Sequence, residues 1–220
     1  MLKPIISASI LSADFAHLAD DVNAVLDAGV HHIHFDVMDH HYVPNLTFGA
    51  DICSALRRAQ ITAPIDVHLM VEHPEKHIEA YAKAGANWIT FHPSTTDSVS
   101  KTIDIIEAAG MHAGLAFNPD EDVTIDDETL KRLKTILLMS VFPGFGGQSF
   151  IETTFAKISA LRKRIDTLQH PLYIGVDGGI KIDNIGAIKK AGANFFVIGS
   201  GLFNHKNYKE CLQQLMLAIK

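Results

Sequence analysis

The segment HFDVMDHH, residues 34–41, places five titratable side chains at the end of an apolar run. Successive side chains of a strand point to opposite faces, so His34, Asp36 and Met38 share one face and the apolar residues between them take the other. An imidazole and a carboxylate on one face can bind a metal ion or transfer a proton. The other polar residues of the segment lie beyond the strand, where we expect them only to contact solvent or cap a turn: Asp39, His40 and His41.

Two further segments carry the same residue types. DVHLMV, residues 66–71, presents His68 on the face that also carries Asp66, and VDGG, residues 176–179, places Asp177 after an apolar run. The candidate ligands of one divalent cation are therefore His34, Asp36, His68 and Asp177. This mixture of imidazole nitrogen and carboxylate oxygen favours Zn²⁺, Fe²⁺, Mn²⁺ or Co²⁺ over Ca²⁺ or Mg²⁺. The alternative is a set of buried polar groups paired with one another as ion pairs.

Short β-rich runs alternate with longer helical patterns along the chain, which is typical of repeated βα units around a parallel sheet. Glycine ends the helical pattern in AGV (28–30), AGAN (84–87), AAGM (108–111) and AGAN (191–194). The predicted strands cover residues 5–11, 32–38, 65–71, 88–93, 112–118, 135–141, 172–178 and 194–200. Eight strands and eight helices predict an α/β fold, a TIM-type (β/α)₈ barrel that forms a single domain over residues 1–220.

A doubly wound open sheet is the competing architecture. It more often has fewer strands and carries a glycine-rich first βα turn, whereas the first turn here, SILSADF, lacks GxGxxG. In a (β/α)₈ barrel the functional groups gather at the C-terminal ends of the strands. The barrel therefore brings the four candidate ligands from strands two, three and seven to one mouth.

Glycine-bearing loops follow strands six, seven and eight, as PGFGGQSF (143–150), DGGI (177–180) and IGSGLF (198–203). Glycine lets backbone N–H groups approach an anion, and the loops after strands seven and eight of such barrels often bind phosphate. Glycine is also usual in tight turns, so the prediction of a phosphate-binding cup depends on the clustering. Loop 143–150 is a candidate lid. Three methionines either fill the core or line the site and exclude water: Met38, Met70 and Met139.

A divalent cation next to a phosphate cup suits chemistry on a phosphorylated sugar. A cation at a ketone oxygen stabilises the enediolate that forms when the neighbouring carbon loses its proton. Inversion at that carbon needs a base on one face and an acid on the other, and Asp36 and Asp177 come from well-separated strands. The sequence thus predicts a two-base epimerase that needs no organic cofactor.

The chain resembles the ribulose-phosphate 3-epimerase family along nearly its whole length. The segments that carry the resemblance, in the family's order, are SASILSADF (7–15), HFDVMDHHYVPNLTFG (34–49), DVHLMV (66–71), MSVFPGFGGQSF (139–150) and VDGG (176–179). The resemblance implies a (β/α)₈ barrel that interconverts D-ribulose 5-phosphate and D-xylulose 5-phosphate in the pentose phosphate pathway, with one divalent metal ion per subunit and a homo-oligomeric assembly.

The resemblance also implies site residues. The metal ligands map onto His34, Asp36, His68 and Asp177, the proton-transfer pair onto Asp36 and Asp177, and a substrate contact near the metal onto Ser9. Substrate and phosphate contacts are expected at His68, Asp177, Gly144, Gly146, Gly147, Gly178, Gly179, Gly199 and Ser200. Three positions depart from the family: His40 where Gly or Asn is usual, Phe142 where Asn or Glu is usual, and Gly175 where Glu or Gln is usual.

Composition excludes several other classes of protein. A formal net charge of −6 gives no basic field for a nucleic acid partner. The two cysteines, Cys53 and Cys211, lack a metal-binding or disulfide-scaffold spacing, and no apolar run reaches the length of a membrane span. We therefore expect a reducing, cytoplasmic setting and no membrane partner.

Three other functions are compatible with parts of this pattern. An epimerase acting on another ketose phosphate, such as D-allulose 6-phosphate, would use the same residues. An aldolase or decarboxylase on a similar barrel would need a lysine or a different acid set at the strand ends, and the predicted strand interiors contain no lysine. A non-catalytic sugar-phosphate binding protein would keep the glycine cup while losing one acid, yet both acids are present.

Overall fold

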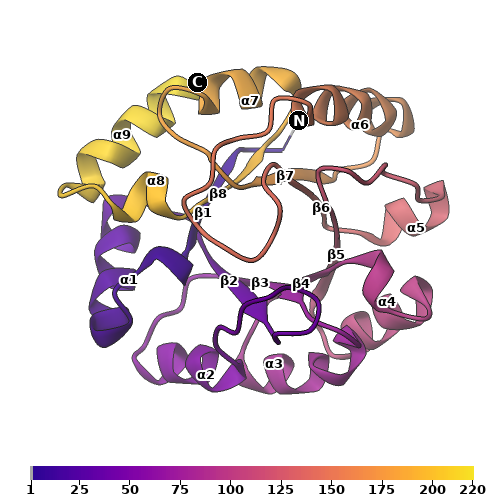
Figure 1. Ribbon diagram of the computed structural model, residues 1–220, viewed down its shortest axis with the longest axis horizontal. Helices are drawn as coiled ribbons and strands as arrows, with labels where there is room; N and C mark the ends of the chain where they lie inside the picture. The colour runs from indigo at the N-terminus through magenta and orange to yellow at the C-terminus, as the bar shows by residue number, and fades with distance from the viewer. Residues whose placement is uncertain (1) are drawn as a thin grey trace.

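A computed structural model describes residues 2–220, and within them eight parallel strands close into a barrel in sequence order (Figure 1). The closing contact joins the first strand to the last, with Ile5 beside Phe195. The strands are β1 (Ile5–Ser9), β2 (His32–Met38), β3 (Ile65–Met70), β4 (Trp88–Phe91), β5 (His112–Phe117), β6 (Thr135–Met139), β7 (Tyr173–Asp177) and β8 (Phe195–Ile198). The predicted (β/α)₈ barrel is confirmed.

Helices surround the strands as an outer ring (Figure 1). They are α1 (Leu18–Ala28), α2 (Ala50–Arg58), α3 (Ile78–Ala84), α4 (Val99–Ala108), α5 (Asp127–Arg132), α6 (Thr154–Leu168), α7 (Ile185–Ala191), α8 (Ser200–Phe203) and α9 (Tyr208–Ala218). The predicted glycine stops are confirmed, because the backbone turns left-handed where these helices end: φ is 111° at Gly29, 89° at Gly85, 78° at Gly110 and 123° at Gly192.

Strand β2 ends at Met38 as predicted, whereas the other seven strands end one or two residues earlier than the sequence pattern predicted. The first strand ends at Ser9, because Ile10–Ser12 form a 3₁₀ turn. The last strand begins at Phe195 and ends at Ile198, and the chain then forms the short helix α8 before α9. Apolar residues continue past the end of the first strand, as Ile10 and Leu11, so hydrophobicity alone does not mark the point at which the chain leaves the sheet there.

Each strand has one face against the helices and one inside the barrel. Phe35 and Leu69 belong to the large core between strands and helices. The lower barrel interior has its own apolar layer, in which the Trp88 and Phe195 rings stack with centroids 5.4 Å apart. Polar side chains therefore occupy only part of the barrel interior. Within residues 2–220, no helix combines the length and apolar character needed to cross a bilayer.

Candidate active site

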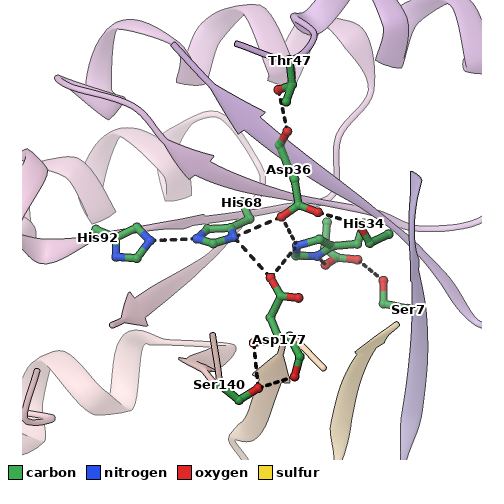
Figure 2. Close-up of polar contacts among 11 residues, drawn as sticks. Ser7, His34, Asp36, Thr47, His68, His92, Ser140 and Asp177 are labelled. Atoms are coloured by element: carbon green, nitrogen blue, oxygen red, sulfur yellow. Dashed lines mark hydrogen bonds and ion pairs between the residues drawn. The ribbon is translucent and has the colours of Figure 1, made fainter. Parts of the chain in front are cut away.

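The barrel brings together the four residues that sequence patterning singled out as metal ligands. His34, Asp36, His68 and Asp177 each offer one ligand atom, and these atoms all lie within 4.8 Å of one another. Strand register explains the meeting, because Asp36 on β2 lies directly beside His68 on β3. Asp177 is the last residue of β7 and arrives from across the barrel (Figure 2).

Two imidazole nitrogens point at the two carboxylates. His34 Nε2 lies 3.3 Å from Asp36 Oδ1 and 3.8 Å from Asp177 Oδ2. His68 Nδ1 lies 3.5 Å from Asp36 Oδ1 and 3.8 Å from Asp177 Oδ2. Both nitrogens are buried and make no hydrogen bond with the residues that the structure describes. Unpartnered nitrogen lone pairs facing carboxylate oxygens fit a divalent cation, so this donor set could hold one.

The opposite nitrogen of each imidazole has a different kind of partner. His34 Nδ1 hydrogen-bonds to a carboxylate oxygen of Asp66, and Ser7 Oγ donates to the other oxygen at 2.6 Å. His68 Nε2 lies 2.9 Å from Nε2 of His92, a second buried imidazole (Figure 2). Sequence reasoning placed Asp66 on the His68 face without assigning it a role, and it missed His92. Functional groups of such barrels gather at the C-terminal ends of the strands, and His92 directly follows β4. The same reasoning applied to the fourth strand would therefore have identified His92.

Backbone anchors hold the two aspartates in place. Thr47 Oγ1 donates to the backbone carbonyl of Asp36 at 2.7 Å, and Ser9 Oγ donates to the Asp36 carboxylate at 2.5 Å. Ser140 Oγ donates to the backbone carbonyl oxygens of Asp177 at 2.9 Å and Gly178 at 2.6 Å. These contacts hold the backbone at both aspartates, and Ser9 also holds the Asp36 carboxylate.

The two aspartates differ in electrostatic environment. Burial raises the pKa of Asp177 to about 8, and the negative charge of Asp36 adds to this effect. Burial also tends to raise the pKa of Asp36, but the positive charge of His34 and the close approach of the His34 and His68 ring nitrogens outweigh it and lower the pKa. Burial likewise opposes charge on His34, yet the charges of Asp66 and Asp36 raise its pKa well above the usual value. These effects favour the protonated form of Asp177 and the ionised form of Asp36.

A cavity opens above Asp36 and Asp177 at the C-terminal end of the barrel. Ser9 and the three methionines predicted to line the site, Met38, Met70 and Met139, are on its wall. So are all the residues expected at the phosphate cup: Gly144, Gly146, Gly147, Gly178, Gly179, Gly199 and Ser200. Glycine is required at Gly179, where φ is 65° and a Cβ atom would lie 2.4 Å from the Phe150 backbone nitrogen.

The residues after β2 lie outside the ligand cluster. The Asp39 carboxylate accepts hydrogen bonds from the backbone N–H groups of His41, Tyr42 and Glu72, so it caps the loop as expected. His40 has φ of 63°, a left-handed conformation in which glycine and asparagine are favoured. This backbone conformation explains why Gly or Asn is usual here in the family that the sequence resembles.

The other two departures from that family have different surroundings. Gly175 lies below Asp177 on the inner face of β7, where a Cβ atom would lie 2.8 Å from Leu137 Cδ1 and 3.3 Å from Phe195 Cδ1. Large apolar side chains thus fill the space that a longer side chain would need. Phe142 is 53% exposed, and its carbonyl accepts a hydrogen bond from Gln148 Nε2 at 2.7 Å. Phe142 therefore contributes to the loop through its backbone.

The fold and site define a (β/α)₈ barrel enzyme with a buried cluster that could hold a metal ion, next to a glycine-lined cavity. The sequence profile of the ribulose-phosphate 3 epimerase family matches residues 5–203, and the chain belongs to this family of isomerases.

Relatives at high sequence identity carry the family's name. The chain is 52% identical to the ribulose-phosphate 3-epimerase of Buchnera aphidicola subsp. Acyrthosiphon pisum, over 98% of this chain and 94% of the relative. It is 48% identical to the ribulose-phosphate 3-epimerase of Escherichia coli K12, over 98% of this chain and 96% of the relative. KGPDC from Streptococcus mutans shares the fold, with a TM-score of 0.70 at 14% identity over 99% of this chain and 98% of that one.

Proposed function

We propose that this chain interconverts D-ribulose 5-phosphate and D-xylulose 5-phosphate by epimerisation at C3, using one divalent metal ion, Zn²⁺, Fe²⁺, Mn²⁺ or Co²⁺, and no organic cofactor. The proposal depends mainly on the positions and pKa values of Asp36 and Asp177. Both aspartates line one cavity, they come from β2 and β7, and their pKa values are shifted in opposite directions. The relatives are named ribulose-phosphate 3-epimerase, which supports a ribulose phosphate as the substrate.

The proton transfers use these two carboxylates. The ionised carboxylate removes the C3 proton from one face of the sugar, and the protonated carboxylate delivers a proton to the opposite face. The two aspartates exchange roles when the reaction runs in reverse. When bound, a divalent cation stabilises the negative charge that develops on the ketone oxygen. His34, Asp36, His68 and Asp177 would hold it.

The remaining cavity residues position the substrate in this proposal. Backbone N–H groups of the glycine-bearing loops after β6, β7 and β8 would bind the phosphate of the sugar. Ser9, which donates to Asp36, would contact the substrate near the cation, and His68 would do so from β3. Buried Met38, Met70 and Met139 give the cavity an apolar wall that limits the access of water.

The reaction is tested by incubating metal-loaded protein with D-ribulose 5-phosphate in D₂O and following C3 by NMR. Xylulose 5-phosphate carrying deuterium at C3 is the expected product. Absence of both turnover and exchange would contradict the proposal. Parallel assays with D-allulose 6-phosphate test the alternative substrate, for which we expect a lower kcat/KM.

Replacing either acid should stop the reaction. Asp36→Asn and Asp177→Asn keep the shape of the side chain but cannot transfer a proton, so each should lower kcat by at least about 10²–10⁴-fold. Asp104→Asn, on the exposed surface of α4, is the charge-matched control and should retain full activity. Full activity of either active-site variant would exclude the two-base assignment.

We also propose the domain content, the assembly and the cellular location of the protein. The main core cluster extends from Ile6 to Ile219, which supports a single catalytic domain over residues 1–220. We further propose a homo-oligomer that works in the cytoplasm on a small phosphosugar, without a nucleic acid or membrane partner. Sedimentation equilibrium measures the assembly, and a monomer at micromolar concentration would contradict the homo-oligomer.

A further inference from the structure

Asp66 is buried below the ligand cluster, and both of its carboxylate oxygens are used. One oxygen is hydrogen-bonded to Nδ1 of His34, and the other accepts the hydrogen bond from Ser7 Oγ at 2.6 Å. Only 4% of the residue is exposed, so water does not compete for these contacts. Ser7 lies on β1, His34 on β2 and Asp66 on β3, and the carboxylate thus links three neighbouring strands.

This contact determines which nitrogen of His34 is available to an ion. An imidazole that donates from Nδ1 to a carboxylate carries its hydrogen there and presents its lone pair at Nε2 once that nitrogen is free of a proton. His34 Nε2 is the atom that faces Asp36 and Asp177. The same contact fixes the ring plane, because Asp66 is itself held by Ser7.

His68 has no such carboxylate behind it. Its Nε2 lies 2.9 Å from Nε2 of His92, so one imidazole donates to the other. His92 is fully buried, and burial lowers its pKa well below the usual value, which favours the neutral ring. The two imidazoles that face the carboxylates are therefore supported by groups of different charge.

We propose that Asp66 is a positioning residue that orients His34 with Nε2 toward the cation and strengthens the binding of the ion, with Ser7 holding the carboxylate in place. This inference depends on the proposed use of a metal ion. A carboxylate behind an imidazole ligand makes the ligand more basic, and loss of such a partner typically lowers metal affinity by about 10–100-fold. Asp66 itself does not contact the substrate cavity.

The first test measures the affinity of the metal-free protein for Co²⁺ by competition with a chromophoric chelator. We expect Asp66→Asn to raise the dissociation constant about 10–100-fold, because the amide carries no charge and can present its NH₂ group to Nδ1. Asp104→Asn is the control and should match the wild type. Wild-type affinity in Asp66→Asn would overturn the proposal.

A second readout distinguishes positioning from a structural role. The Nδ1 proton of His34, hydrogen-bonded to a buried carboxylate, should give a low-field ¹H resonance in metal-free and Zn²⁺-loaded protein. Asp66→Asn should remove or shift it, and an unchanged resonance would overturn the proposal. If Asp66→Asn fails to fold, Ser7→Ala replaces it and should weaken Co²⁺ binding several-fold, whereas unchanged affinity there would equally count against the proposal.

The two proposals fail in different ways. If the wild-type protein binds no Co²⁺ or Zn²⁺, the metal dependence of the proposed function is wrong, and the His34 resonance of the metal-free protein still decides whether Asp66 orients the ring. If the wild type binds tightly and Asp66→Asn binds equally well, the metal dependence stands and the role of Asp66 is wrong.

Discussion

At the scale of single residues, Asp36 and Asp177 show how environment assigns different properties to one side chain. The positive charge of His34 and several hydrogen bonds favour the ionised form of Asp36. The ionised form of Asp177 is less favoured, because its side chain is only 13% exposed and lies near the negative charge of Asp36. Two identical residue types thus acquire opposite tendencies to hold a proton.

The raised pKa of His34 predicts a pH dependence of metal binding. Burial opposes the charge of this imidazole, but the charges of Asp66 and Asp36 raise its pKa well above the usual value, so in the metal-free protein a cation at Nε2 must displace a proton. Apparent affinity for Co²⁺ should therefore rise as the pH increases, and protons should be released on binding at pH 7. Calorimetric titrations in buffers of different ionisation enthalpy count these protons, and an absence of release at pH 7 would show that the imidazole is already neutral.

At the scale of elements, strand alternation and register position the site, and loops close it. The register of adjacent β2 and β3 places Asp36 beside His68, and β7 brings Asp177 across the barrel to 3.8 Å from the His68 ring. Above the cavity, the loop after β2 contacts the loop after β6: Asn45 Nδ2 donates to the Gly144 carbonyl at 2.9 Å. This bond holds the glycine-bearing loop 143–150 over the mouth of the barrel.

Breaking this contact should affect substrate binding more than stability. Asn45→Ala removes the partly buried hydrogen bond to Gly144 and an exposed one from the Leu46 N–H group. The partly buried bond makes a net contribution of about 1 kcal/mol, which corresponds to roughly a fivefold rise in KM if the loop closes over the sugar phosphate. The Tm should change little. Leu46→Ala, an exposed neighbour on the same loop, is the control. Steady-state kinetics check the prediction, and an unchanged KM in Asn45→Ala would mean that the contact has no part in loop closure.

At the scale of the whole molecule, one end of the barrel holds the candidate active site and the other end contributes to stability. The C-terminal mouth holds the ligand cluster and the cavity, while hydrogen bonds join the turns at the other end. Arg57 at the end of α2 shows this: its guanidinium donates to the carbonyls of Ile61, Ala63 and Gly85 and to Asn87 Oδ1. One side chain thus joins the turns that precede β3 and β4.

This separation predicts a variant with lower stability and normal chemistry. Arg57→Ala should lower the free energy of unfolding by about 2–3 kcal/mol, because several carbonyl groups lose a charged donor. The kcat of the folded protein should remain unchanged, since these contacts lie at the end of the barrel opposite the site. Urea unfolding and steady-state assays at low temperature measure both quantities. A large fall in kcat with unchanged stability would show that the two ends are coupled.

The amino-acid sequence by itself determined the repeated βα units, the glycine helix stops and the pairing of His34 with Asp36 on one strand face. Period-two alternation and strand-end position are local properties, so they can be read without a structure. The roles of Ser7, Asp66 and His92 were decided only by the tertiary structure. Their hydrogen bonds join residues 59, 32 and 24 positions apart. Such contacts depend on barrel closure and strand register, which no short segment specifies.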